Sequence, residues 1–430
     1  MQNWPKFFTL YVGNLLEHYD MALYGFLSPL FATLFFSGED YLSALMITYA
    51  IIPLSMVAKP LGSLFFGYLG DRYSRVYSLS LSLFGVAIAT VFIGMLPSYQ
   101  SAGAAAPILL LTARLVQSFF SSAETMGGGI YLLENLHTEK ERDIASSFYS
   151  TSTIAGILIA SSLISLFYLL GITEACWRTL YFFGAVTALM GAILRMQDVK
   201  VAPTSGKSFK QKPNFMAILK EQLNLFVILR REVVMIMVAS GFSYACYSMA
   251  FVFMTGFAPL VTDVTKEQIA LLNTCMLMVD FLALPLMGVV ATCLSRTTLM
   301  SSAALVAFFA AMPLLILLES ASFPLLIGVR IAFVLIGVCF SATLHSWAQS
   351  LIPYEHRYTA INFAYAIGSQ LFGGTTALIS LWLYRQSSVV AAASLYWLIL
   401  AALAYGAICA SRQQEQDSLF PNRAAGAPRT

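Results

Sequence analysis

The sequence predicts an all-α integral membrane protein with twelve transmembrane helices in two pseudo-symmetric six-helix bundles. Hydrophobic residues make up 59% of the chain and charged residues only 10%, whereas about a quarter of the residues in soluble domains are charged. Apolar runs of about 18 or more residues, each long enough to cross a bilayer, recur along the whole chain. Related sequence patterns also return in the same order in the two halves, which indicates an internal repeat.

The N-terminal bundle is predicted over residues 1–196. Its six apolar segments cover residues 7–36, 42–69, 76–97, 107–133, 144–170 and 177–196. The first segment begins close to Met1, is longer than the apolar core of a signal peptide and has no small-residue cleavage site. We therefore expect it to be retained as a membrane anchor.

A polar segment over residues 197–230, which contains the stretch KSFKQKPN, is predicted to be a cytoplasmic linker between the bundles. The C-terminal bundle is predicted over residues 231–411. Its six apolar segments cover residues 231–260, 266–294, 297–319, 322–350, 356–384 and 388–411. The tail over residues 412–430 has no heptad repeat, so we expect it to be disordered and cytoplasmic rather than a coiled coil.

Three pairs of sequence stretches carry the internal repeat. They are GYLGDRYSR at 67–75 with GVVATCLSR at 288–296, PILLLTAR ending at Arg114 with PLLIGVR ending at Arg330, and ERDIASSF before the fifth segment with HRYTAINF before the eleventh. Two six-helix halves of this kind place a substrate site between them near the middle of the membrane, and they alternate access to it by rocking.

Lysine and arginine lie mainly in the loops on one side of the predicted bundles. With both termini on that side, it receives the basic residues of the linker and tail together with Lys6, Arg72, Arg75, Lys140, Arg142, Arg296 and Arg357. The other side receives Arg178, Lys266 and Arg385. Because cytoplasmic loops are the ones enriched in Lys and Arg, both termini are predicted to be cytoplasmic. The net charge of +3 then reflects topology and not nucleic-acid binding.

Ionisable residues lie deep within several predicted helices. They are Glu17, His18, Asp20, Lys59, Arg114, Glu124, Asp280, Arg330 and His345. A charge at the centre of a transmembrane helix costs roughly 2.5–3.5 kcal/mol on insertion scales, so such residues usually face the protein interior or a water-filled cavity. The sequence leaves the roles of Asp280, Arg330 and His345 open.

The first helix carries Asn14, Glu17, Asp20 and Tyr24, with His18 four residues after Asn14. At about 3.6 residues per turn, these residues form one polar stripe that can face a single cavity. Two carboxyl groups at low dielectric resist ionising together, so Glu17 and Asp20 can hold a proton near neutral pH. The alternative is that they form buried ion pairs with Lys59 or Arg114 and take no part in transport.

On the fourth helix, Arg114 and Glu124 are separated by about 15 Å along the axis. A guanidinium group can hold a carboxylate by two hydrogen bonds, so Arg114 is a candidate for binding a carboxylate-bearing substrate. It can equally form a salt bridge to the first helix. Glu124 is a second candidate proton carrier, or a partner for a substrate ammonium group.

The turn GDRYSR at residues 70–75 lies at a predicted cytoplasmic helix end. A charged turn in that position is commonly just solvated. Asp71, Arg72 and Arg75 can alternatively latch neighbouring helix ends across the cytoplasmic side.

Aromatic residues of the seventh helix include Phe242, Tyr244, Tyr247, Phe251 and Phe253. They can surround a quaternary ammonium group by cation–π contacts, although aromatic residues are equally ordinary on lipid-facing surfaces. The six cysteines are scattered, with no CxxC spacing and no cysteine–histidine cluster, so neither a disulfide framework nor a metal site is predicted.

These segments together resemble the major facilitator superfamily and, within it, the metabolite:proton symporter family. The family's first-helix pattern, Glu-Trp-Tyr/Phe-Asp-Phe with a later Tyr-Gly, is matched by Glu17, His18, Tyr19, Asp20, Met21, Tyr24 and Gly25. Its Arg-Pro-Leu-Gly-Gly is matched by Lys59, Pro60, Leu61, Gly62 and Ser63, and the superfamily's Gly-Asp-Arg-x-Gly-Arg by residues 70–75. Its fourth-helix pattern is matched by Arg114, Gln117, Ser118, Ser122, Ala123 and Glu124.

The sequence departs from the family pattern at several of these positions. Lys59 stands for arginine, His18 for tryptophan, and Thr292 for the aspartate expected in the second-half copy of the turn. The match is strong over residues 1–196 and faint beyond, so the chain resembles a divergent member.

The resemblance implies a major facilitator fold and proton symport of a small carboxylate-bearing metabolite into the cell. Substrates of the family include citrate, ketoglutarate, shikimate, proline and betaines. From these residues we predict proton coupling by Glu17, Asp20 and Glu124, substrate binding by Asn14, His18, Tyr24, Lys59, Arg114 and Gln117, and gating by Asp71, Arg72, Arg75 and Arg142. We expect a monomer in a bacterial inner membrane, with protons as the coupling ion and no other cofactor or metal.

Other functions remain open at this stage. A uniporter or exchanger would use the same cavity without proton coupling, and a membrane receptor or transceptor would bind a substrate without moving it. A drug exporter is disfavoured because the fifth helix, STIAGILIASSLISLF, has one glycine and no proline. An enzyme is not expected, since no nucleophile–base pair or metal cluster is evident.

Overall fold

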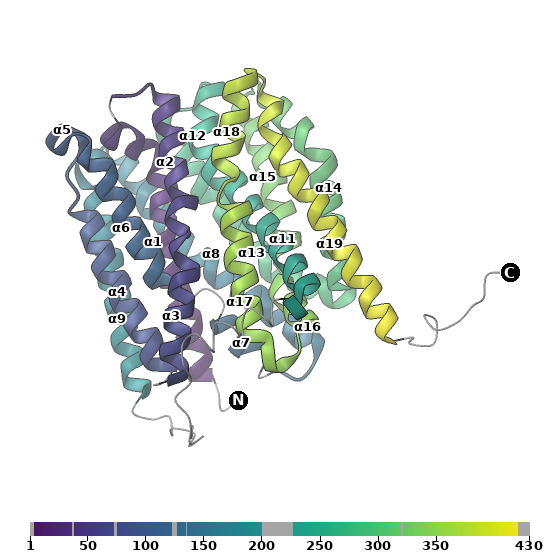
Figure 1. The fold of residues 1–430 in the computed structure, drawn as a ribbon. Helices are drawn as coiled ribbons and strands as arrows, with labels where there is room; N and C mark the ends of the chain where they lie inside the picture. Colours follow the sequence, from purple (N-terminus) through teal and green to yellow (C-terminus); the bar gives the residue numbers. More distant parts are fainter. Residues whose placement is uncertain are drawn as a thin grey trace.

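The computed structural model describes residues 4–36, 38–72, 75–122, 127–134, 136–199, 227–319 and 321–419, and every regular element within these ranges is helical. The first half contains α1 (Trp4–Phe35), α2 (Tyr41–Met56), α3 (Ala58–Arg72), α4 (Arg75–Gly94), α5 (Tyr99–Ala102), α6 (Ala105–Ser121), α7 (Gly127–Glu134), α8 (Glu139–Leu169) and α9 (Thr173–Val199). These helices stand side by side in the purple-to-blue part of Figure 1.

The second half forms the green-to-yellow part of Figure 1. It contains α11 (Arg230–Tyr247), the π-helix η1 (Ser248–Phe253), α12 (Met254–Val261), α13 (Lys266–Cys293), α14 (Arg296–Ile316), α15 (Phe323–Ser341), α16 (Leu344–Leu351), the 3-10 helix η2 (Tyr354–His356), α17 (Arg357–Ile367), the π-helix η3 (Gly368–Gly373), α18 (Thr376–Ser387), the 3-10 helix η4 (Val390–Ser394) and α19 (Leu395–Leu419).

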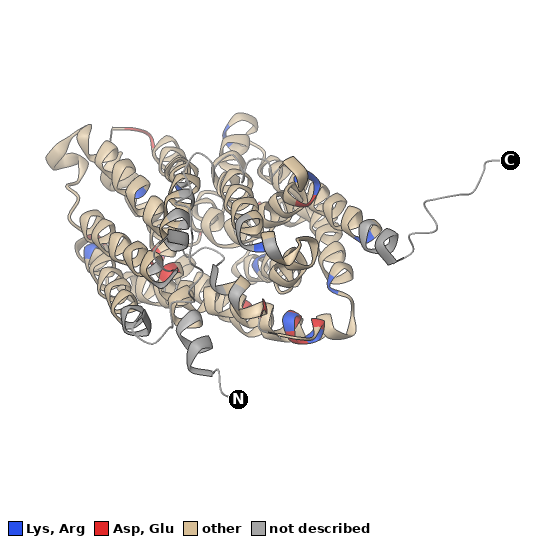
Figure 2. Ribbon diagram, turned by 60° about the horizontal axis from the view of Figure 1, so that its bottom comes forward, with Lys and Arg blue, Asp and Glu red and all other residues tan. Residues whose placement is uncertain are grey.

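Each predicted membrane span contains one or more of these helices, in the predicted order. Among the described residues, nine helices are long and apolar enough to cross a membrane, and two shorter apolar helices lie at Ser80–Gly94 and Ala105–Ser121. The remaining predicted span is α1, whose Glu17, His18 and Asp20 lower its mean hydropathy. Lys, Arg, Asp and Glu are sparse on the described ribbon (Figure 2). The all-helical membrane architecture expected from the composition is therefore present.

Several predicted spans are divided in the structure. The second becomes α2 and α3, the tenth becomes α15 and α16, and the seventh and eleventh each contain a π-helix. The short helix α5 was not predicted. The last helix continues to Leu419, past the expected boundary at 411, while the rest of the tail and most of the predicted linker lie outside the described residues.

Close helix crossings depend on two glycines at corresponding places in the halves. A Cβ atom on Gly156 of α8 would lie 2.0 Å from the carbonyl oxygen of Leu15 on α1. A Cβ atom on Gly368 of η3 would lie 2.0 Å from the carbonyl oxygen of Met237 on α11. Small residues at such positions let helix backbones approach closely within a membrane. The crossings hold α1 and α11 in place beside the space between the halves.

The two halves meet mainly along α8 and α13. We call the end of the molecule at which α1 begins and α19 ends the terminal face, and the end at which α2 begins the opposite face (Figure 1). At the terminal face, Ser146 of α8 donates a hydrogen bond to the carbonyl of Ala342 in the second half, at 3.0 Å. At the opposite face, Ser165 of α8 donates to the carbonyl of Ala270 on α13, at 2.8 Å.

Candidate functional site

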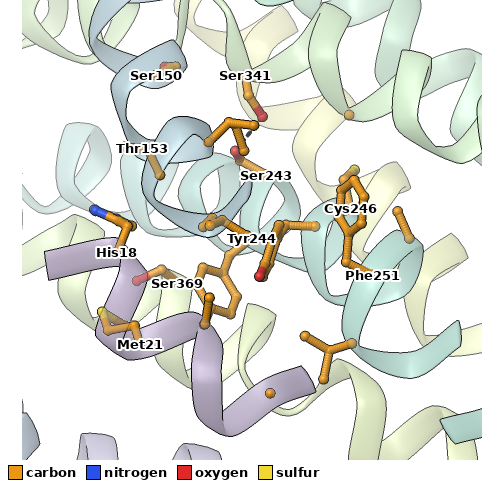
Figure 3. Close-up of a pocket in the computed structure, with 18 of the residues that line it drawn as sticks. His18, Met21, Ser150, Thr153, Ser243, Tyr244, Cys246, Phe251, Ser341 and Ser369 are labelled. Atoms are coloured by element: carbon orange, nitrogen blue, oxygen red, sulfur yellow. Dashed lines mark hydrogen bonds between the residues drawn. The ribbon is translucent and has the colours of Figure 1, made fainter. Parts of the chain in front are cut away.

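A cavity of about 150 Å³ lies between the two halves. Its acidic, basic and histidine side chains are Glu17, His18, Lys59 and Arg114 from the first half, and Asp280 and His345 from the second. Figure 3 shows His18 and Met21 of α1 on one side with Ser369 of η3 beside them, Tyr244 near the middle, and Cys246 and Phe251 of the second half on the other side. Both π-helices line the cavity, η1 with Phe251 and η3 with Ser369. Such local widenings of a helix are frequent at functional sites.

Asp20 and Arg114 are joined by one amide side chain, that of Gln117 on α6. The Arg114 guanidinium donates a hydrogen bond to Gln117 Oε1 at 2.5 Å, and Gln117 Nε2 in turn donates to Asp20 Oδ2. Thr90 of α4 also donates to Asp20 Oδ2, at 3.0 Å. Among the described residues, Asp20 Oδ1 accepts no hydrogen bond. The Asp20 carboxylate is therefore linked through Gln117 to Arg114 at the cavity wall, and its Oδ1 has no hydrogen-bond donor among the described residues.

The Arg114 guanidinium is fixed over an aromatic ring. Its Cζ lies 4.5 Å from the ring centroid of Tyr24, and the Tyr24 hydroxyl donates to the carbonyl of Thr48 at 2.9 Å. A cation over an aromatic face is stabilised by the ring quadrupole. Arg114 is only 3% exposed, so this contact and the bond to Gln117 hold it in a set orientation at the cavity wall.

Lys59 of α3 provides a second positive charge at the cavity. It is 1% exposed, and its Nζ lies 3.8 Å from Met21 Sδ. Lys59 interacts electrostatically with Glu17 on α1 and with Arg114. The first half therefore places the basic groups of Lys59 and Arg114 near the acidic groups of Glu17 and Asp20 in a buried region. This arrangement is compatible with both interpretations of the two acids, as proton carriers and as partners in buried ion pairs.

The polar stripe of α1 divides among three environments. Glu17 and Tyr24 line the cavity. Asp20 faces α4 and α6, and Asn14 donates to Ser152 Oγ and Thr153 Oγ1 of α8, each at 2.8 Å. Asn14 and Asp20 differ by about 120° in azimuth at 100° per residue, which is wide enough for the two residues to reach different neighbours. Asn14, a candidate substrate ligand, thus joins two helices and does not line the cavity.

His18 does line the cavity, as expected. Its Nδ1 lies 2.8 Å from the carbonyl oxygen of Asn14. Across the cavity, His345 of α16 packs its ring edge-on to Tyr149, with centroids 5.3 Å apart.

The sequence repeat pairs Arg114 with Arg330, but the two side chains have different surroundings. Arg330 on α15 is fully buried and is not among the residues that line the cavity. Its Nη2 donates to the Asn273 side chain and, at 2.8 Å, to the carbonyl of Ala250 in η1. Arg330 therefore supports the π-helix that carries Phe251.

Only part of the aromatic series of the seventh helix faces the cavity. Tyr244, Tyr247 and Phe251 line it. Phe242 packs against Phe340 with ring centroids 4.8 Å apart, and Phe253 stacks on Phe257 at 4.5 Å.

The structure leaves several predicted residues without a described side chain. Glu124 lies outside the described residues, and α3 ends at Arg72 while α4 begins at Arg75, with no side chain of Asp71, Arg72 or Arg75 described. Arg142 is described, and its Nε and Nη2 donate to the carbonyl of Leu136 at 3.2 and 3.1 Å.

A charged cluster at the terminal face had not been assigned from sequence. Arg296, at the start of α14, forms ion pairs with Glu139 at 3.1 Å and with Asp143 at 3.8 Å, both on α8. Ser346 of α16 donates a hydrogen bond to Asp143. The internal repeat could have indicated this cluster, because Arg296 is the last residue of GVVATCLSR and Asp143 lies in ERDIASSF.

The opposite face also carries polar contacts between the halves. Arg385 of α18 donates to Ser43 Oγ at 2.7 Å and lies 4.0 Å from Asp40. The hydroxyl of Tyr49 on α2 donates to the carbonyl of Val252 in η1 at 2.9 Å. Polar contacts therefore join the halves at both faces, with the cavity between the halves.

Curated relatives resemble this chain over most of its length. A proline/betaine transporter of Salmonella typhimurium is 24% identical over 408 residues, which covers 91% of this chain and 80% of that protein. A putative proline/betaine transporter of Staphylococcus aureus is 26% identical, with 92% and 85% covered. A glycine betaine/proline/ectoine/pipecolic acid transporter of Dickeya dadantii is 25% identical, with 91% and 80% covered.

Solved structures show the same fold. A D-xylose–proton symporter superposes with a TM-score of 0.68 at 15% identity, covering 94% of this chain and 96% of that one. The human organic anion transporter MFSD10 gives a TM-score of 0.66 at 14% identity, covering 94% and 98%. The Major Facilitator Superfamily model matches residues 10–264. These relatives are transporters and not enzymes, and the chain accordingly belongs to the Major Facilitator Superfamily of membrane transporters.

Proposed function

We propose that the protein is a proton symporter that imports a small carboxylate-bearing metabolite, such as an organic acid, an amino acid or a betaine. The observation that carries the proposal is the hydrogen-bonded series from Arg114 through Gln117 to Asp20. It links a cation at the cavity wall to an acid that can hold a proton. The curated relatives, whose names include proline and betaine, support this substrate class.

Charge balance gives the coupling a physical basis. With Glu17 and Asp20 ionised, they offset the charges of Lys59 and Arg114 within the same buried region. Protonation of Asp20 leaves one positive charge without compensation, which is costly away from water. A substrate carboxylate at Arg114 restores the balance, so proton and substrate favour each other's binding. Binding free energies are coupled reciprocally in this way.

Alternating access then requires the halves to separate at one face at a time. We assign the terminal face to the cytoplasm, as the distribution of lysine and arginine predicts. The ion pairs of Arg296 with Glu139 and Asp143 would close the cytoplasmic side, and the contacts of Arg385 and Tyr49 would close the other. We further propose that the protein acts as a monomer in a bacterial inner membrane.

The test uses purified protein in liposomes with an acidic exterior. We expect labelled substrate to accumulate above its external concentration and a protonophore to abolish the accumulation. Asp20→Asn should lose accumulation but keep substrate counterflow, because the proton site is removed while the cavity remains. Arg114→Ala should lose binding in both assays.

Three outcomes would contradict the proposal. Accumulation that survives the protonophore, with no other ion gradient present, rules out proton symport. Uptake that only equilibrates identifies a uniporter or exchanger. Binding without any flux identifies a receptor or transceptor.

A further inference from the structure

Asp280 lies near the middle of α13, about 20 Å from either end of the helix at 1.5 Å per residue. It is 8% exposed and lines the cavity from the second half. Within the described part of the chain, Asp280 makes no hydrogen bond and no ion pair. An ionised carboxylate in such a position is strongly destabilised unless a cation joins it. The cavity therefore presents an acceptor without a protein partner.

Tyr247 is the aromatic residue that interacts with this carboxylate, and two further cavity-lining rings adjoin it. The ring centroids of Tyr244 and Tyr247 are 5.8 Å apart, and those of Tyr247 and Phe251 are 5.4 Å apart. All three side chains line the cavity, and Tyr247 interacts electrostatically with Asp280. Aromatic faces attract cations, most strongly when water is excluded. A negative group next to aromatic faces is the lining that suits an alkylated ammonium ion.

The same series of rings leads back to the positive wall of the cavity. Tyr244 interacts electrostatically with Arg114 of the first half, and Tyr247, its neighbour, interacts with Asp280. With Asp20 protonated, the first-half wall of Arg114, Lys59 and Glu17 carries a net positive charge, whereas Asp280 on the second half is negative, and aromatic rings lie between them. A ligand with separated opposite charges fits this polarity, whereas a dianion would place one carboxylate against Asp280.

We propose that Asp280, with Tyr247 and Phe251, forms a subsite for the ammonium group of a zwitterionic substrate whose carboxylate binds at Arg114. This inference rests on the proposed carboxylate site and narrows its substrates to amino acids and betaines. The substrate bridges the halves, since Arg114 belongs to the first and Asp280 to the second. Occupancy therefore draws the two halves together around the ligand.

The test compares two ligands of the same shape. Glycine betaine and 3,3-dimethylbutanoate share a carboxylate and three methyl groups, but the second has a neutral carbon in place of the quaternary nitrogen. Binding to the purified full-length protein is measured by calorimetry. We expect wild type to bind glycine betaine at least about tenfold more tightly, because a contact to a buried charge is worth roughly that factor or more.

Variants of the subsite test which side chains produce the preference for glycine betaine over 3,3-dimethylbutanoate. Asp280→Asn should remove it, Asp280→Glu should retain it, and Tyr247→Leu should weaken betaine binding while leaving the isostere unchanged. Asp263→Asn is the matched control, since Asp263 is an exposed acid between α12 and α13 and does not line the cavity. It should bind both ligands like wild type. The ligand comparison on wild type stays decisive even where Asp280→Asn fails to fold.

Each contrary result has a definite meaning. Equal binding of the two ligands by wild type, or an undiminished preference in Asp280→Asn, overturns the ammonium subsite. So does an Asp280→Asn variant that keeps betaine affinity but loses proton-driven uptake, since Asp280 would then carry the proton. Binding of citrate or 2-oxoglutarate but not of betaine or proline overturns the subsite and leaves the proposed symport standing. Absence of binding by every carboxylate tested removes both.

Discussion

The close crossing of α1 and α8 at Gly156 predicts that one added methyl group lowers the stability of the folded protein. In Gly156→Ala the new Cβ would lie 2.0 Å from the Leu15 carbonyl oxygen, whereas ordinary contacts begin at 3.4 Å. The helices must therefore separate by 1.4 Å (3.4 Å less 2.0 Å). Forcing extra volume into a packed interior destabilises a protein by about 1–3 kcal/mol.

The separation also affects nearby polar contacts. The hydrogen bonds from Asn14 to Ser152 and Thr153 are 2.8 Å long in the structure, and an added 1.4 Å would take them beyond hydrogen-bonding distance. Each such bond is worth about 0.5–1.5 kcal/mol. The better helix propensity of alanine offsets about 0.5–1 kcal/mol of this loss, so we expect a net destabilisation of about 1–5 kcal/mol.

The assay is thermal unfolding of purified protein in detergent, followed by a thiol-reactive dye. Gly328→Ala is the matched control, because a Cβ on that glycine of α15 would meet nothing within 4 Å. Gly368→Ala, at the corresponding crossing in the second half, should resemble Gly156→Ala. An unfolding midpoint for Gly156→Ala equal to that of Gly328→Ala would refute the account of the crossing.

The remaining predictions concern the terminal face. Asp143→Asn removes an acidic partner of Arg296, so it should increase labelling of engineered cysteines inside the cavity from the cytoplasmic side and slow transport. Unchanged labelling would show that the ion pairs do not hold this face closed. Asp71→Asn should shift the same labelling and leave substrate affinity in the binding-competent state little changed, since a 1.4 kcal/mol change alters a two-state ratio about tenfold. If it has no effect, GDRYSR is only a topology signal.

Sequence alone was sufficient for the course of the chain through the membrane. Apolar length determines where a helix can span a bilayer, and backbone polar groups without water must be satisfied within helices. The predicted spans therefore agree with the helices to within about five residues, even where a span is divided, except that the last helix continues to Leu419, eight residues past the predicted end at 411 (419 less 411). The repeat likewise predicted a site between the halves, and a cavity lies there.

The partners of the polar side chains were decided by tertiary structure. Helical spacing gives the direction of a side chain from its own axis, but not which neighbour occupies that direction. Asn14 and Asp20 were predicted to share one face, yet Asn14 meets α8 and Asp20 meets α4 and α6. Arg114 and Arg330 occupy equivalent places in the repeat, and only Arg114 reaches the cavity. The ammonium subsite proposed at Asp280 could be inferred only from the packing, which brings Tyr247 and the first half near it. The interaction of two charges depends on their separation in space and not along the chain.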